Sequence, residues 1–495
     1  MNILLHLIVL LPLGAAIAVL LGAPARKTSL GASVTALMLT ILTIVAYLKT
    51  DGGFQFGGGF SVVPEWDLKY FLGVDGLSLA MVLLSTIVTV AAVWVTPKVE
   101  NGENAFYACL LFIAAGAIGA FLSLDLFFFY AFHELALIPT FILIGVWGSG
   151  EKQQAAWRIT IYLAIGSIIL LAGLIGVYLS FPADLRTFDI PELHRLSKTT
   201  AFLPGKWIFP TLLVGFGVLV SLFPFHSWAP KAYASAPAPA AMLHAGVLKK
   251  FGLYGMLRIA LPMFPLGIQQ YDYLILILLI GNILFIGLAT IAQKQLDSTL
   301  GYSSVMHMGY IYLGIVSMNL TGLNGAALLM FAHGLSIAAL FAMSGMIRER
   351  TGTLELSDLG GLGKRAPVLM FCFGLATFAS IGLPGFGNFA AETMVFFGAF
   401  SGGFEANAFA VGSFNFHQIA TVVGLWGVVI SAVYMLRAYR KIFMGDLVAR
   451  WAGISDIAAT YKIPLVLLIG TLLVSGLYPK GFLQLVGPTL SRLLP

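Results

Sequence analysis

The sequence predicts an all-α membrane protein whose helices cross the bilayer many times. Of its 495 residues, 59% are hydrophobic and only 10% are charged, whereas soluble domains carry about 25% charged residues. Five ionisable residues nevertheless lie deep inside apolar stretches, namely Glu134, Lys250, His307, His333 and Glu392. A charge at that depth costs roughly 2.5 to 3.5 kcal/mol even on a lenient scale. The five residues therefore indicate transport of protons or ions.

We expect about fourteen transmembrane helices, since a helix needs about 20 apolar residues to cross a bilayer. In chain order they cover residues 3-22, 29-48, 73-95, 105-123, 125-148, 159-180, 208-225, 239-261, 270-292, 301-318, 322-346, 367-400, 409-436 and 463-487. No basic residue precedes the first apolar run, which predicts a first span and not a cleaved signal peptide. Cys109 and Cys372 lie inside spans, so they predict neither a disulfide framework nor a metal site.

The basic residues outside the spans predict the orientation of the chain. With fourteen spans, alternate loops face the same side of the bilayer. One set of loops and span ends holds sixteen Lys and Arg, and the other set holds nine. Because the more basic loops of a membrane protein face the cytoplasm, we expect both termini on the non-cytoplasmic side. The net charge of +6 then reflects topology and does not indicate nucleic-acid binding.

Two predicted spans are interrupted by helix-breaking residues. The seventh contains Pro224, and the twelfth contains Gly382-Leu-Pro-Gly-Phe-Gly387. Proline removes a backbone donor, so such breaks free carbonyl groups that must line protein or water. Interrupted spans in corresponding places of two halves indicate an inverted-repeat transporter. The expected divisions are 1-104 for helices one to three, 105-265 and 266-445 for two inverted five-helix halves, and 446-495 for the C-terminal loop and helix fourteen.

Seven short sequence motifs, distributed over nearly the whole chain, resemble those of a known protein family. They are Gly73-Val-Asp75-Gly, Asp125-Leu-Phe-Phe-Phe with Glu134 and Pro139, Pro224-Phe-His226-Ser-Trp228, Tyr302-Ser-Ser-Val-Met-His307-Met-Gly-Tyr310, Ala332-His333-Gly-Leu-Ser336 before Arg348-Glu-Arg350, Leu383-Pro-Gly-Phe-Gly-Asn388 before Glu392, and Tyr434-Met-Leu-Arg437. Together they resemble the antiporter-like subunits of respiratory complex I, in particular the chain M type of NADH-quinone oxidoreductase. Subunits of Mrp-type antiporters and membrane-bound hydrogenases share most of these strings.

The resemblance implies a proton relay made of the five buried ionisable residues. Glu134 resembles the fifth-span acid that couples to a neighbouring subunit, and Lys250 resembles the central lysine of the eighth span. His307 and His333 resemble the positions that carry the path onward through the tenth and eleventh spans. Glu392 resembles the twelfth-span residue on the exit side, where the chain L type carries a lysine. His244 is a secondary candidate, because other antiporter-like subunits have histidine in this region.

One departure from the family pattern concerns the seventh span. The family places a lysine five residues before the proline of this span, and here that position is Leu219. That lysine modulates the fifth-span acid, so Glu134 needs another partner. We hypothesise that Lys249 or Arg158 takes over the switching role. Lys231, which replaces an acid of the family pattern, is a third candidate, whereas Arg158 matches a basic position of the family.

Two classes of function fit the sequence, and a third is open. The first is a proton-translocating subunit of complex I, coupled to quinone reduction elsewhere in the complex. The second is a subunit of a Mrp-type Na+/H+ antiporter or a membrane-bound hydrogenase. The strings around Glu392 favour the first. Because the family lysine is absent at Leu219, a third interpretation is a structural paralogue that does not pump protons.

The resemblance also implies the partners and the location of the chain. We expect no cofactor in this chain, and we expect FMN, iron-sulphur clusters and the quinone site in partner subunits. The expected partners are other membrane-arm subunits of complex I, including further antiporter-like subunits, and the lipid bilayer. The expected location is the bacterial inner membrane.

Overall fold

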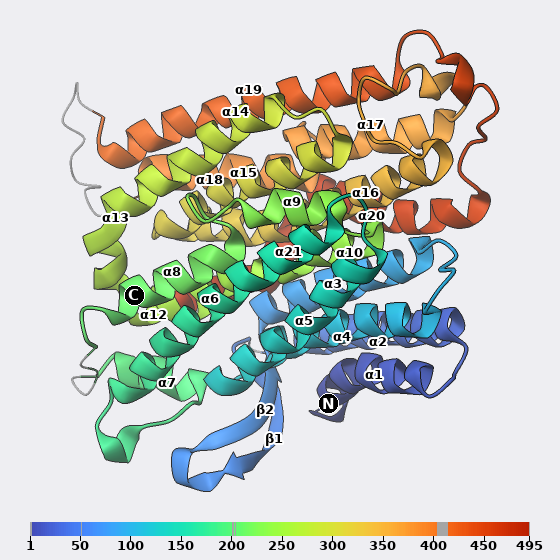
Figure 1. The fold of residues 1–495 in the computed structure, drawn as a ribbon. Helices are drawn as coiled ribbons and strands as arrows, with labels where there is room; N and C mark the ends of the chain where they lie inside the picture. Colours follow the sequence, from blue (N-terminus) through green and yellow to red (C-terminus); the bar gives the residue numbers. More distant parts are fainter. Residues whose placement is uncertain (1, 51, 200–201, 203, 403–413, 495) are drawn as a thin grey trace.

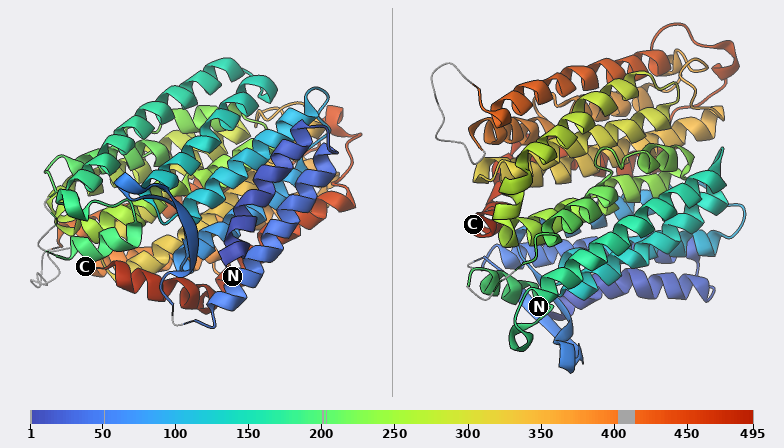
Figure 2. Two further views of the ribbon diagram at one scale, coloured as in Figure 1. Left: turned by 90° about the horizontal axis from the view of Figure 1, so that it is seen from below. Right: turned by 60° about the vertical axis from the view of Figure 1, so that its left-hand side comes forward.

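The computed structural model describes the chain except for residues 1, 51, 200–201, 203, 403–413 and 495. Long helices lie side by side in one bundle and keep a common direction, as Figure 1 and the turned views in Figure 2 show. Within the described residues, ten helices are long and apolar enough to cross a membrane. The polytopic helical class is confirmed, while the number of fourteen spans stays a prediction.

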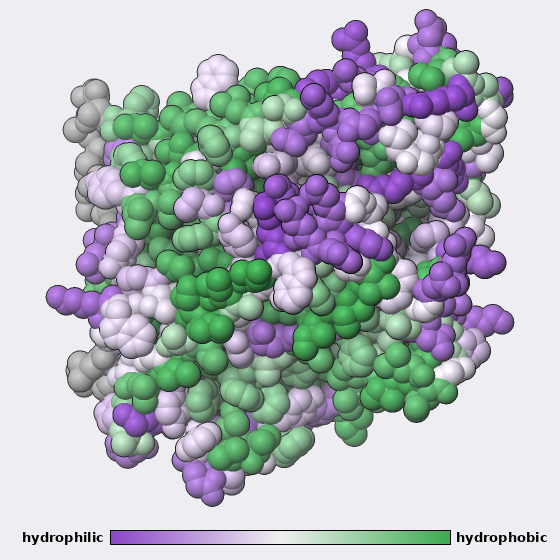
Figure 3. All heavy atoms as spheres, in the orientation of Figure 1, coloured by the Kyte–Doolittle hydropathy of each residue, from purple (hydrophilic) through white to green (hydrophobic). Residues whose placement is uncertain are grey.

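The N-terminal part supplies six long helices. They are α1 (Asn2–Leu20), α2 (Ala25–Tyr47), α3 (Gly76–Val95), α4 (Glu103–Leu122), α5 (Leu126–Trp147) and α6 (Lys152–Leu179). α3 and α4 are buried almost throughout, whereas α6 exposes apolar side chains such as Ile161, Ile165 and Ile168. Figure 3 shows hydrophobic surface over much of this face of the molecule. Exposed apolar surface of this extent is typical of contact with lipid or with a partner protein.

Both predicted interruptions are present in the structure. The seventh span is divided into α8 (Ile208–Val220) and α9 (Trp228–Ser235), and the twelfth into α17 (Pro367–Ile381) and α18 (Gly387–Ser401). α8 ends at Ser221 and α17 ends at Gly382, where the backbone is left-handed with φ of 66° and 80°. A left-handed residue ends a helix because the next peptide cannot continue its hydrogen-bonding pattern.

The middle of the bundle is built from the eighth, tenth and eleventh predicted spans. The elements are α10 (Ala238–Leu243), a π-helical segment (His244–Leu248), α11 (Lys250–Gly255), a second π-helical segment (Met256–Ala260), α12 (Leu261–Met263), α15 (Leu296–Val316) and α16 (Leu320–Thr351). α16 contacts α10, α15, α17 and α18, and it is buried throughout its apolar window. π-helical turns are rare and frequently lie at functional sites.

The remaining helices close the outer side of the bundle. They are α7 (Ile190–Ser197), α13 (Pro265–Ile280), a π-helical segment (Gly281–Phe285), α14 (Ile286–Ile291), α19 (Phe416–Phe443), α20 (Ala459–Leu477) and α21 (Pro479–Leu493). The predicted extent of the last span, 463-487, is wrong, because α20 ends at Leu477 and Pro479 begins a new helix. The residue before a proline is disfavoured in helical conformation. Residues 409–413 of the predicted thirteenth span lie outside the described residues.

A β-hairpin precedes α3 and was not expected from the sequence. β1 (Gln55–Val63) pairs antiparallel with β2 (Leu68–Val74), and Phe60 lies opposite Tyr70. The hairpin projects from the bundle below the other elements in Figure 1. A Cβ atom on Gly59 would lie 1.8 Å from the carbonyl oxygen of Tyr70, so only glycine fits there. The glycine-rich composition of this segment obscured the alternation by which strands are recognised.

A buried ion pair joins the start of α3 to the second π-helical segment. Asp75 caps α3 by accepting a hydrogen bond from the backbone N–H of Ser78 at 2.9 Å. Arg258 donates to both carboxylate oxygens of Asp75, at 2.6 and 2.8 Å, and both side chains are buried. Arg258 therefore does not belong to the loops in which the orientation prediction counted it. Its removal from the smaller set of nine makes the charge asymmetry larger.

Breaking this pair from one side is expected to destabilise the protein. Arg258→Met leaves the carboxylate of Asp75 buried without its cation, which costs roughly 3 to 5 kcal/mol. The double variant Asp75→Asn/Arg258→Met is expected to recover much of the loss, because Asn still caps α3 and carries no charge. The measurement is the midpoint of thermal unfolding of the purified protein. Arg195→Ala, which breaks the exposed pair with Glu192, should change it little. Equal midpoints for the single and double variants would contradict the expectation.

Candidate functional site

Lys250 and His333 are in direct contact in the middle of the bundle. Lys250 is fully buried at the start of α11, directly after the first π-helical segment. Its Nζ atom donates to the backbone carbonyl of Ala245 at 2.6 Å and lies 3.0 Å from Nδ1 of His333 on α16. In its ammonium form, the side chain of lysine has donors and no acceptor. Nδ1 of His333 is therefore the acceptor when Lys250 is charged. A proton can therefore pass along this contact.

His307 continues the contact toward the interrupted twelfth span. The ring of His307 on α15 lies 5.3 Å from the ring of His333, measured between centroids. Its Nδ1 lies 2.8 Å from the carbonyl oxygen of Ser303, and its Nε2 lies 3.0 Å from the carbonyl oxygen of Ser380. Both partners only accept hydrogen bonds, so both are satisfied at once only when each ring nitrogen carries a proton. The two carbonyl groups therefore favour the imidazolium form of His307, whereas its burial opposes that form.

Glu392 ends this row on α18. Its Oε1 atom lies 3.9 Å from Nε2 of His307, and within the described residues it has no hydrogen-bond partner. A Cβ atom on Gly382 would lie 2.3 Å from Oε2 of Glu392, so the carboxylate occupies space that only glycine leaves open at the helix break. The structure thus brings Lys250, His333, His307 and Glu392 into one continuous row, which is called the central row below.

Lys249 and His244 lie on the other side of the eighth span. Consecutive residues of a helix point about 100° apart, and Lys249 faces α9 while Lys250 faces α16. The Nζ atom of Lys249 lies 5.5 Å from the ring centroid of Tyr233, whose hydroxyl lies 3.1 Å from Nδ1 of His244. Lys249 is buried, and its Nζ has no hydrogen-bond partner among the residues that the structure describes.

Glu134 lies apart from the central row, near the surface of the bundle. Ser167 of α6 donates to its Oε1 atom, and Nδ1 of His133 lies 3.5 Å from the same atom. The side chain of Glu134 is 34% exposed, which leaves it accessible to a neighbouring molecule. The ring of His133 stacks on Phe251 at 4.1 Å, directly beside Lys250 in sequence. In the described part of the chain, neither Lys249 nor Arg158 forms an ion pair with Glu134.

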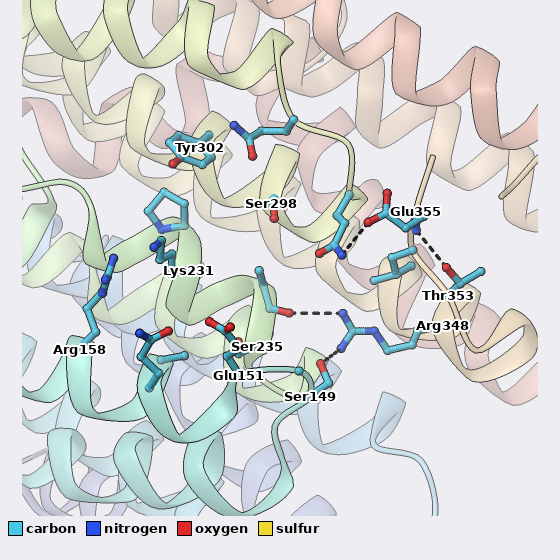
Figure 4. A pocket seen from close by; sticks show the side chains of 18 of the residues that line it. Ser149, Glu151, Arg158, Lys231, Ser235, Ser298, Tyr302, Arg348, Thr353 and Glu355 are labelled. Carbon is cyan, nitrogen blue, oxygen red and sulfur yellow. Dashed lines mark hydrogen bonds between the residues drawn. The ribbon is translucent and has the colours of Figure 1, made fainter. Parts of the chain in front are cut away.

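Arg158 lines a polar cavity between the two halves of the chain. The cavity has a volume of about 580 Å³ and is open on one side. Figure 4 shows Arg158 and Lys231 on one side of it and Arg348 with Glu355 on the other. Arg158 lies nine residues before Ser167 on α6, which is about 14 Å along a helix. Its position therefore fits the cavity and not the surroundings of Glu134.

Hydrogen-bonded polar groups lie between this cavity and the seventh span. Arg348 donates to the hydroxyl of Ser149 at 2.5 Å and to the carboxylate of Asp297 at 2.6 Å. One helical turn beyond Arg158, the hydroxyl of Tyr162 accepts a hydrogen bond from Ser227 at 2.9 Å. Ser227 directly precedes α9, so polar groups follow one another from the cavity to the break between α8 and α9.

Two ion pairs were missed at the level of the sequence. Asp272 on α13 and His417 on α19 form a buried pair, 2.8 Å apart, and Asp297 forms a partly exposed pair with Arg348. Asp272 and His417 lie inside the predicted spans 270-292 and 409-436. The signal that could have found this first pair is the one that found the central row, an ionisable residue within an apolar stretch.

The family model described as "NADH:quinone oxidoreductase/Mrp antiporter, TM" matches residues 123–416, which include the central row. The chain belongs to this family. Chain 4 of the NAD(P)H-quinone oxidoreductase of Gloeobacter violaceus is 33% identical, over 99% of this chain and 92% of its own length. Subunit M of the NADH-quinone oxidoreductase of Rhodobacter capsulatus is 34% identical, over 95% of this chain and 90% of its own length.

Solved structures of the family share the same fold. A chain of respiratory complex I from Thermus thermophilus with bound NADH has a TM-score of 0.88 at 26% identity, covering 99% of this chain and 100% of that chain. A chain of the Mrp complex from Dietzia sp. has a TM-score of 0.84 at 21% identity, covering 100% and 97%. The second likeness shows the fold alone. The expected resemblance to antiporter-like subunits of complex I is thus confirmed.

The two adjacent lysines are expected to differ in their effect on stability. Lys249→Met removes a buried amine that lacks a hydrogen-bond partner among the described residues, so the thermal unfolding midpoint should stay equal or rise. Lys250→Met leaves Nδ1 of His333 without its donor, which costs about 1 to 3 kcal/mol. The two midpoints are compared in the purified protein. A larger loss for Lys249→Met than for Lys250→Met would contradict the contacts described above.

Proposed function

We propose that this chain is a proton-translocating subunit in the membrane arm of an NADH-quinone oxidoreductase. Protons move along the central row, while quinone reduction takes place in other subunits of the complex. The observation that carries this proposal is the row itself: Lys250, His333, His307 and Glu392 follow one another across α11, α16, α15 and α18. Each of them binds and releases one proton, and none has to move far to pass it on.

The row suits protons because every step joins titratable groups. The ammonium of Lys250 faces an imidazole nitrogen at 3.0 Å, and imidazole takes up a proton at one nitrogen while releasing another. The two carbonyl acceptors around His307 stabilise its doubly protonated form. The carboxylate of Glu392 reaches the break between α17 and α18. Backbone groups freed at such a break tolerate a change of charge. Protons therefore leave the row at the twelfth span.

We assign the role of the missing seventh-span lysine to Lys249. It faces α9, the second half of the interrupted seventh span, where its Nζ lies 5.5 Å from the ring centroid of Tyr233. α11 packs directly against α8, since a Cβ atom on Gly252 would meet the backbone of Phe216. A cation on this face of the eighth span stands close to where a lysine at Leu219 would have placed one.

Arg158 is assigned to proton uptake and Glu134 to coupling with a neighbouring subunit. Beyond the cavity that Arg158 lines, the hydrogen-bonded hydroxyls of Tyr162 and Ser227 lie toward the break of the seventh span. The excess of basic residues in its set of loops supports a cytoplasmic position for this cavity, with both termini on the opposite side. The partial exposure of Glu134 suits contact with a further antiporter-like subunit of the membrane arm.

A gradient-driven antiporter and a non-pumping paralogue are the alternatives. The fold shared with the Mrp complex supports the first, and the buried apolar side chain of Leu219 supports the second. The domain divisions at 104, 265 and 445 agree with the positions of the two broken helices and are part of the proposal. FMN, iron-sulphur clusters and the quinone site are assigned to partner subunits.

Proton pumping by the intact complex tests the proposed function. The complex is purified with variants of this chain and reconstituted in lipid vesicles, and protons moved per electron are measured during NADH oxidation. Lys250→Ala and Glu392→Gln are expected to lower this ratio, because each removes a titratable group from the row. Arg195→Ala, in an exposed loop pair, is the control.

The alternatives give different results in the same vesicles. A ratio that stays at the wild-type value in both variants would indicate a subunit that does not pump. Proton movement that needs Na+ on the opposite side and no electron donor would indicate an antiporter. Either result would overturn the proposed function.

The role of Lys249 is tested by moving the lysine back to the seventh span. Lys249→Leu is expected to lower the ratio of protons to electrons, and Leu219→Lys/Lys249→Leu is expected to restore part of it. Arg158→Ala is measured in parallel, with a slower uptake of protons as the expected result. Wild-type pumping in both Lys249→Ala and Arg158→Ala would show that neither residue replaces the missing lysine.

A further inference from the structure

Asn388 carries a fully buried amide without a hydrogen-bond partner. It is the second residue of α18, and within the described residues neither its Oδ1 nor its Nδ2 atom is paired. A buried polar group left unpaired costs about 1 to 3 kcal/mol. Such groups are rare in folded proteins, and those that occur commonly bind a water molecule or an ion. The amide of Asn388 therefore indicates a site for a small ligand.

The geometry of α18 brings Glu392 to this amide. Residues four apart lie on the same face of a helix, and Glu392 is four residues after Asn388. Helical side chains lean toward the N-terminal end of their helix. The contact of the Glu392 carboxylate with Gly382, which precedes α18, shows that this side chain does so. The carboxylate thus reaches back over the first turn of α18, where Asn388 lies.

The gap between His307 and Glu392 has the size of a water-bridged contact. Nε2 of His307 and Oε1 of Glu392 are 3.9 Å apart, which is longer than a direct hydrogen bond. Polar contacts beyond about 3.5 Å are commonly bridged by one water molecule. The hydroxyl of Tyr310, whose ring lies 5.6 Å from that of His307, is also buried and has no partner within the described residues.

The donors and acceptors at this place fit water better than a metal cation. Oε1 of Glu392 and Oδ1 of Asn388 accept hydrogen bonds, while Nδ2 of Asn388 needs an acceptor. A sodium ion satisfies the oxygen atoms but cannot accept a hydrogen bond from the amide N–H. A water molecule does both, and buried waters typically form about three hydrogen bonds to groups of this kind.

We propose that Asn388 is a positioning residue that holds a water molecule against Oε1 of Glu392. The proton then passes from His307 to Glu392 through this water. The N–H bond at Nε2, whose hydrogen is shared between the carbonyl oxygen of Ser380 and the water, breaks as an O–H bond of the water forms, and a second O–H bond of the water breaks as its proton binds Oε1. His307 ends neutral, Glu392 ends as the neutral acid, and the water is unchanged. This inference rests on the proposed function of the central row.

The test uses the intact complex with Asn388→Leu, a change of similar volume that removes both polar atoms. Infrared difference spectra report the C=O stretching band of protonated Glu392, identified by its loss in Glu392→Gln. Asn388→Leu is expected to shift this band to higher frequency, because the acid loses a hydrogen bond. Proton translocation should slow by about tenfold, as expected for one lost hydrogen bond in the transfer step. Its pH profile should move with the shift of the band.

Two further variants separate positioning from packing. Asn388→Ser keeps a polar group and leaves room for water, so it is expected to restore the band and most of the rate. Asn324→Leu removes a half-buried amide on α16, whose Oδ1 also has no partner in the described part of the chain. This amide faces α21, since a Cβ atom on Gly487 would lie 3.7 Å from its Oδ1, and its loss should leave the band and the rate unchanged.

The outcomes also separate this inference from the proposed function. If Glu392→Gln stops pumping while Asn388→Leu leaves the band and the rate as in the wild type, Asn388 does not position the water and the row still stands. If Asn388→Ser fails to restore what Asn388→Leu removes, the role of Asn388 is structural and the inference is overturned. If Glu392→Gln pumps normally, the proposed function itself is wrong.

Discussion

The cost of burying charge in an apolar bundle is the constraint on which this structure depends. An ionised side chain that leaves water must find a partner or become neutral. The protein meets this requirement by placing its deepest ionisable groups next to one another, so that Lys250 faces His333 and His307 faces two carbonyl groups and Glu392. In the proposed function, a row of adjacent titratable groups satisfies this constraint and conducts protons at the same time.

The two interrupted helices serve this row in different ways. At the break between α17 and α18, Gly382 leaves the space that the carboxylate of Glu392 occupies. Beyond the break between α8 and α9, Tyr233 of α9 contacts His244 and lies beside Lys249 of the eighth span. α16 carries His333, contacts α15 and α18 and is buried along its length, so a rigid element fixes the distances on which proton transfer depends.

Much of this arrangement follows from the sequence, because hydropathy and helix breakers act locally. The spans, both breaks and the residues of the central row could be predicted from apolar stretches, from Pro224 and Gly382, and from the strings of the family. The hairpin at Gln55–Val63 could not, because its glycines hide the period of a strand. The Asp75–Arg258 pair could not either, since it joins residues 183 positions apart. Nor does a sequence show that Arg158 lines a cavity about 14 Å from Ser167.

In the proposed function, Lys249 of the eighth span replaces the lysine that the family pattern places at the position of Leu219 in the seventh span. α8 and α11 are packed so closely that a Cβ atom on Gly252 would lie 2.5 Å from Val220, so the two positions border the same interface. A lysine on either helix charges that interface, but only Lys249 also adjoins Lys250 in sequence. Under the proposal for Lys249, a proton arriving there favours release of the proton on Lys250 into the row, because like charges on neighbouring residues repel in a medium of low dielectric constant. This proposed coupling does not require a lysine in the seventh span.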